Sequence, residues 1–123
     1  MKSCLSVGMR SAVTFSVDRS HAAAFEGRVI HNVLSTVHLV YYAELAARNL
    51  ITPYLEEGED AAGGGICLNH SAPTKIGDTV KVTAILSGID GKKLICRIEG
   101  TNSKGSICNA TQTQILVRKG SLD

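Results

Sequence analysis

The sequence has no apolar run long enough to cross a bilayer, which takes about 20 consecutive residues. It also lacks an apolar region of about 7–15 residues behind Lys2, the core of a secretory signal peptide. Lysine and arginine form no dense block, and the net charge is only +2. These absences argue against a membrane or a nucleic acid as partner, whereas a small anionic molecule remains compatible.

Paired cysteines and metal-binding motifs are also missing. None of the four cysteines has Cys-x-x-Cys spacing; they are Cys4, Cys67, Cys96 and Cys108. Cys96 and Cys108 could face each other across a hairpin, but reduced thiols in a cytoplasmic protein are the simpler interpretation. His31 and His38, seven residues apart, are a poor metal site without a carboxylate or cysteine at matching spacing. We therefore expect no metal and no cofactor.

What the sequence does contain is one long apolar segment, residues 35–51, without glycine or proline. It predicts a central helix that runs on to about Leu55, with Asn32, Ser35 or Thr36 as its cap. Five apolar side chains fall on one i, i+4, i+7 stripe of this helix: Val33, Val37, Val40, Ala47 and Ile51. Glu44 lies in the same stripe. A carboxylate on a face that should be buried is costly unless it is paired or has a task.

Five extended segments accompany this helix, one before it and four after it. They are residues 9–17, 63–70, 79–89, 92–101 and 107–118. Asp90-Gly91 predicts a two-residue hairpin turn. Residues 22–32, which contain Gly27, predict an irregular loop, and residues 56–60 an acidic, solvated turn. The order is therefore strand, long helix and four strands in an antiparallel meander.

This order predicts a single α+β domain over residues 1–123. A lone antiparallel sheet of about five strands is completed most simply by wrapping around the long central helix, which is the hotdog fold. Its exposed strand edge would be covered by an identical subunit. We therefore expect a homodimer or a dimer of dimers.

Three local motifs resemble the hotdog-fold acyl-CoA thioesterases, and most of all the fluoroacetyl-CoA thioesterase-like branch. They are Thr36-x7-Glu44-x-Ala46-Ala47, Gly63-x6-His70-x-Ala72-x-Thr74-x2-Gly77 and Asp90-Gly91-Lys92-Lys93-Leu94. The likeness covers residues 7–117. The chain departs from the pattern at Val37, where the family often has proline, and at Gly63-Gly64-Gly65, where it has one glycine.

The resemblance implies hydrolysis of a small or medium acyl-CoA at a site in or near a dimer interface. Such hydrolysis needs an activated nucleophile, a proton carrier and donors for the oxyanion. Glu44 is then the candidate general base or orienting carboxylate, and His70 the proton carrier. Thr36 would bind the carbonyl or a water, or attack the carbonyl itself to form an acyl-enzyme. Gly63 or Gly64 would let a backbone N–H approach the carbonyl without a Cβ in the way.

Each candidate residue also has a structural interpretation. Glu44 could turn to solvent, His70 could be a structural strand end, Thr36 a helix cap, and the glycines a flexible turn. In one continuous helix, Thr36 and Glu44 would lie about 12 Å apart along the axis, too far for a direct hydrogen bond.

Other functions on the same fold remain open. A non-catalytic acyl-CoA-binding module would share the fold and the pocket, and only turnover would separate it from an enzyme. A hydratase or dehydratase typically carries an Asp-x4-His pair near the helix start, and this sequence has none there. A purely structural dimer is the remaining alternative.

Overall fold

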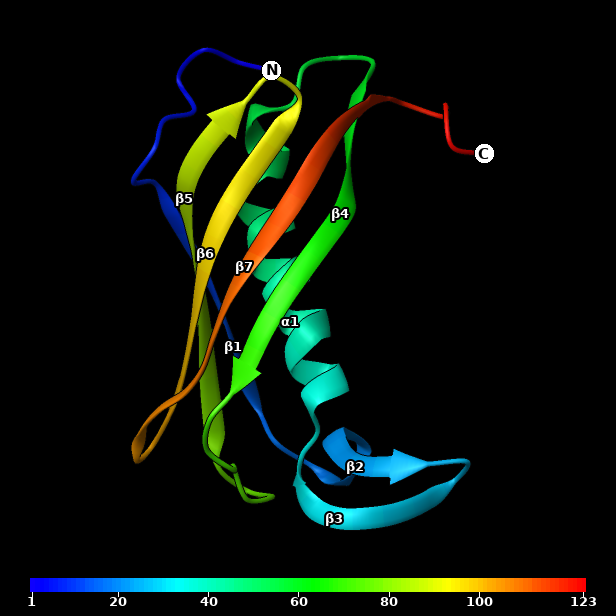
Figure 1. Ribbon diagram of the computed structural model, residues 1–123, viewed down its shortest axis with the longest axis vertical. Coiled ribbons are helices and arrows are strands. Elements are labelled where there is room, and N and C mark those ends of the chain that lie inside the picture. Colours follow the sequence, from blue (N-terminus) through cyan, green and yellow to red (C-terminus); the bar gives the residue numbers. More distant parts are fainter.

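The computed structural model describes residues 1–123, in which five antiparallel strands curl around one long helix (Figure 1). The sheet consists of β1 (Arg10–Ser16), β4 (Glu59–His70), β5 (Thr79–Asp90), β6 (Lys93–Asn102) and β7 (Gly105–Arg118), and the helix is α1 (Thr36–Ile51). Two short strands, β2 (Ala22–Phe25) and β3 (Arg28–Leu34), pair separately, and 3-10 turns cover Arg19–His21 and Thr52–Tyr54. This arrangement confirms the predicted α+β hotdog architecture.

The strand order is β1-β5-β6-β7-β4, so the predicted meander of four strands is wrong. Only β5, β6 and β7 are joined by tight turns, with Gly91 and Gly105 in left-handed conformations. The longer link over residues 71–78 carries the chain from β4, at one side of the sheet, to β5 beside β1. As a result β4 pairs with β7 alone and leaves its other edge free.

Helix α1 starts at Thr36 because the Ser35 hydroxyl accepts a hydrogen bond from the His38 N–H, at 3.2 Å. It ends at Ile51, short of the predicted end, because Pro53 lacks the N–H that would continue it. No helix has both the length and the apolar character that crossing a bilayer requires.

The buried face of α1 differs from the predicted stripe. It consists of Leu39, Ala43, Ala46, Ala47, Leu50 and Ile51. Val37 is 67% exposed, and Val33 belongs to β3. Three of these six residues are alanines, whose small side chains allow the helix to pack closely on the sheet. Glu44 therefore lies at the margin of the buried face, half-exposed.

The inner face of the sheet supplies the rest of the core through alternating apolar residues of β5, β6 and β7. Burial raises the pKa of the Cys96 thiol to about 11, and that of Cys108 also above its usual range. Both thiols are free. They pack as small protonated apolar groups and not as nucleophiles.

The predicted irregular loop over residues 22–32 is instead the hairpin of β2 and β3. Its turn residues, Glu26 and Gly27, both have positive φ, as a two-residue hairpin turn of the primed type requires. The hairpin lies below the start of α1 (Figure 1), where the Leu34 N–H donates to the Thr74 carbonyl. Glutamate is an unusual residue at the first turn position, so the sequence carries little sign of this hairpin.

Candidate active site

The first residue of α1 meets the last residue of β4. Thr36 Oγ1 lies 2.9 Å from Nδ1 of His70, within hydrogen-bond distance. Ser35 caps the helix, so the cap interpretation of Thr36 is wrong and its exposed hydroxyl is left for His70. The other ring nitrogen of His70, Nε2, is buried and has no partner in the chain. A hydroxyl beside an imidazole is the arrangement of a nucleophile with its base.

Glu44, about two turns further along α1, faces β4 and β7. Nε2 of Gln112 donates to Oε1 of Glu44 at 3.4 Å. On the β4 side, a Cβ at Gly63 would lie 2.9 Å from Cδ of Glu44. A side chain at this position would require the Glu44 carboxylate to move, so the carboxylate lies directly against the backbone of β4.

Gly63 and Gly64 lie inside β4, which begins at Glu59, and not in a flexible turn as the alternative interpretation had it. The pairing of β4 with β7 shifts register between Gly63 and Gly65, which leaves Gly64 outside the regular ladder. A Cβ at Gly64 would lie 2.6 Å from Cγ1 of Ile115, whereas one at Gly65 would contact nothing. A side chain at either of the first two glycines would therefore displace a neighbour, Glu44 or Ile115.

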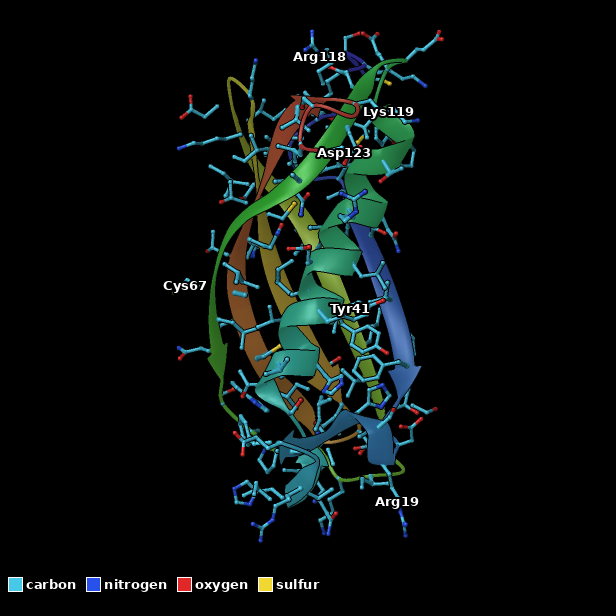
Figure 2. All side chains as sticks on the ribbon, turned by 90° about the vertical axis from the view of Figure 1, so that its right-hand side faces the viewer. Arg19, Tyr41, Cys67, Arg118, Lys119 and Asp123 are labelled. Atoms are coloured by element: carbon cyan, nitrogen blue, oxygen red, sulfur yellow. The ribbon has the colours of Figure 1, made fainter.

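A groove of about 330 Å³ opens beside Glu44 on the outer face of α1. Its walls are Val40, Tyr41, Glu44, Leu45 and Arg48. Figure 2 looks onto this uncovered face, with Tyr41 near its centre and Cys67 at the edge of β4. Arg48 donates to the Ala61 carbonyl and pairs with Asp60 at 3.7 Å, which ties the start of β4 to α1. Glu44, which is half-exposed, thus forms part of the wall of this groove.

The predicted residues form two groups and not one. Thr36 contacts His70, and Glu44 contacts Gly63, but about 12 Å of helix axis separate Thr36 from Glu44. Gln112 is a contact of Glu44 that sequence reasoning missed. The sequence feature that could have revealed it is a glutamine at an inward position of β7, where the alternating pattern predicts an apolar side chain.

Known proteins match this chain in sequence and in fold. The profile of the fluoroacetyl-CoA-specific thioesterase family matches residues 17–120. The chain belongs to that family. A fluoroacetyl-CoA thioesterase of Streptantibioticus cattleyicolor is 34% identical over 85 residues, which are 69% of this chain and 61% of that protein. The match thus spans less than two thirds of that relative's length.

Solved structures of related proteins superpose on nearly the whole chain. A thioesterase superfamily member from Thermus thermophilus has a TM-score of 0.92 at 28% identity, over 95% of this chain and 87% of that one. A mutant fluoroacetyl-CoA-specific thioesterase in complex with fluoroacetate and CoA has a TM-score of 0.89 at 28% identity, over 97% and 100%. Both support the thioesterase-like fold that the motifs suggested.

A second polar cluster of the present protein lies where α1 starts beside β1. Nε2 of His21 is 3.2 Å from the Tyr42 hydroxyl, and the Tyr42 ring stacks on Phe15. The His38 ring meets that of His21 edge-on, and its Nδ1 is 2.5 Å from Oγ of Ser35. Burial, and secondly the neighbouring His21, lower the pKa of His38. His31, considered above as its metal-binding partner, is exposed on β3.

Replacing Gly63 by alanine should displace Glu44, because the new Cβ would clash with the carboxylate. We expect the rate of thiol release from an acyl-CoA to fall about 100-fold, the cost of misplacing a catalytic group by about 1 Å. The matched control is Gly65→Ala, whose Cβ meets nothing within 4 Å. Equal rates for the two variants, both folded, would contradict this geometry.

The lowered pKa of His38 should make stability depend on pH. Below the ordinary histidine value of 6.5, the unfolded chain binds a proton that the folded protein resists, so the free energy of unfolding decreases as pH falls. Above that pH, the contribution of His38 to the free energy of unfolding is fully present. We expect urea unfolding to show this loss from about pH 6.5 downward, and His38→Gln to reduce it. His31→Gln is the control, and parallel curves for wild type and His38→Gln would refute the assignment.

Proposed function

We propose that this protein hydrolyses a small or medium acyl-CoA thioester to the free acid and coenzyme A. The observation that carries the proposal is the contact between Thr36 and His70, which pairs a hydroxyl with a base at 2.9 Å. Family membership supports the reaction class, and the CoA-bound relative described above supports the choice of carrier.

The chemistry divides between the two groups of residues. Glu44, as general base, takes the proton of the attacking water, and His70 gives a proton to the departing thiolate and regains one from Glu44. Where Thr36 attacks instead, His70 takes its proton, the acyl group passes to the Thr36 oxygen, and the activated water hydrolyses that ester in a second step. The C–S bond breaks, a free thiol leaves, and the elements of water end on the acid and the thiol. Glu44 orients and activates the water. A backbone N–H at Gly63 or Gly64 donates to the carbonyl oxygen as its negative charge develops.

We propose a homodimer formed through the free edge of β4, either alone or as half of a dimer of dimers. That edge lacks the lysine or proline that usually protects an exposed strand, and apolar side chains beside it are exposed: Val37, Tyr41 and Ile66. Antiparallel pairing of two β4 strands about a two-fold axis would bring the His70 end of one copy towards Gly63 of the other. One active site would then combine Thr36 and His70 of one copy with Glu44 of its partner.

The hairpin of β2 and β3 would contact the acyl group. It lies at the same end of α1 as Thr36 and exposes three large apolar side chains, Phe25, Val29 and Ile30. These side chains suit a short apolar chain better than a charged one. We further propose a cytoplasmic location, in keeping with the four free thiols.

The proposed activity predicts thiol release from one class of acyl-CoA. The assay would compare short, aromatic and long acyl-CoAs, with fluoroacetyl-CoA among the short ones. Glu44→Ala and His70→Ala should each reduce turnover about 100-fold or more, because each removes a proton-transfer group. Size-exclusion chromatography and thermal unfolding would establish that both variants keep the wild-type assembly and fold.

Two other outcomes of this assay would change the conclusion. No turnover on any substrate, with acyl-CoA still raising the melting temperature, would favour the non-catalytic binding module. Turnover that is unchanged in both variants would show that Glu44 and His70 are not the catalytic residues.

A further inference from the structure

Two glutamines lie in the core at inward positions of β7. Gln112 is 1% exposed and Gln114 is completely buried, on the strand face that also carries Cys108 and Ala110. A buried amide costs free energy unless its N–H and C=O groups find partners. Of the four amide N and O atoms in these two side chains, only Nε2 of Gln112 has one, and that partner is Glu44.

Gln112 makes the only side-chain hydrogen bond of the Glu44 carboxylate. Glu44 takes part in no salt bridge, and Arg48, one turn further along α1, donates to Ala61 and pairs with Asp60 instead. An ionised carboxylate can only accept hydrogen bonds, so the amide must turn its N–H towards Glu44 and its oxygen away. That oxygen is indeed buried without a partner. The carboxylate therefore orients the amide, and the amide oxygen is left without a hydrogen-bond partner.

The position of Gln112 is rigid. Its strand is paired on both sides, with Cys96 of β6 and Ile66 of β4 opposite this residue. Gly63, on the other side of the carboxylate, belongs to the same sheet. The carboxylate thus lies between the Gln112 amide and the Gly63 backbone, and these two groups cannot move independently. Such an arrangement keeps a reactive group in a productive orientation.

We propose that Gln112 is a positioning residue for thioester hydrolysis. Its N–H holds the Glu44 carboxylate in one orientation beside the groove on the outer face of α1. This inference rests on the proposed role of Glu44 as base, and it assigns Gln112 no contact with the substrate.

Gln112→Leu tests the proposal, because leucine is close in size and lacks the N–H. We expect kcat to fall about tenfold with KM within about twofold, since positioning affects the chemical step more than binding. Gln112→Glu keeps the shape but replaces the N–H by a second carboxylate, so its kcat should fall at least as far. Gln112→Glu can therefore replace Gln112→Leu in this assay if the leucine variant does not fold.

Gln114→Leu is the matched control. It makes the same change on the same strand face, at a residue with no hydrogen bond to Glu44. We expect its kcat and KM to equal those of wild type, and its melting temperature to be equal or higher because a buried unpartnered amide is removed.

Glu44→Ala separates this inference from the proposed function. Full activity in Glu44→Ala would overturn the proposed base and, with it, the role of Gln112. If Glu44→Ala is inactive while Gln112→Leu and Gln112→Glu keep the wild-type kcat, the base stands and the positioning role fails. A fall in kcat in Gln114→Leu as large as that in Gln112→Leu would also refute it, because the effect would then not depend on the hydrogen bond.

Discussion

The rigidity of α1 is the constraint on which the rest of this structure depends. An uninterrupted helix holds Thr36 and Glu44 about 12 Å apart along its axis, and six buried side chains fix the helix to the sheet. Each of the two residues then meets a different part of β4, Thr36 at its end and Glu44 at its glycines. One chain therefore holds the two contacts apart, and the edge of β4 opposite β7 is free. Under the proposed dimer, a second copy at that edge would unite them.

The surroundings of Glu44 contain residues that stability alone would not favour. The strand next to the carboxylate has glycine where a β-branched residue would suit a strand better, and the strand behind it has buried glutamine where an apolar residue would. Each unpartnered amide group costs about 1–3 kcal/mol. The contact with Glu44 accounts for Gln112, whereas nothing in the structure explains Gln114.

The sequence predicted what local patterns and spacing determine. The helix, the five main strands, the hotdog fold and the family follow from periodicity and from three motifs, and the structure with the comparisons confirms them. The partner of β4, the buried face of α1 and the hairpin of β2 and β3 depend on packing between distant residues, so local patterns missed them. The sequence did not identify Gln112 as a candidate, because a polar residue in a strand indicates a special role only once it is known to face the core. The catalytic roles of Thr36, Glu44 and His70, and substrate binding by Gly63 and Gly64, stay predictions.

Mixing two inactive variants tests the shared active site most directly. Glu44→Ala and His70→Ala would be unfolded together, refolded together and assayed for thiol release, with each variant alone as reference. If one site takes Glu44 from one copy and His70 from the other, half of the dimers are mixed, and each mixed dimer has one intact site. This account predicts recovery of about one quarter of wild-type activity. A mixture that forms mixed dimers and stays as inactive as its components would contradict it.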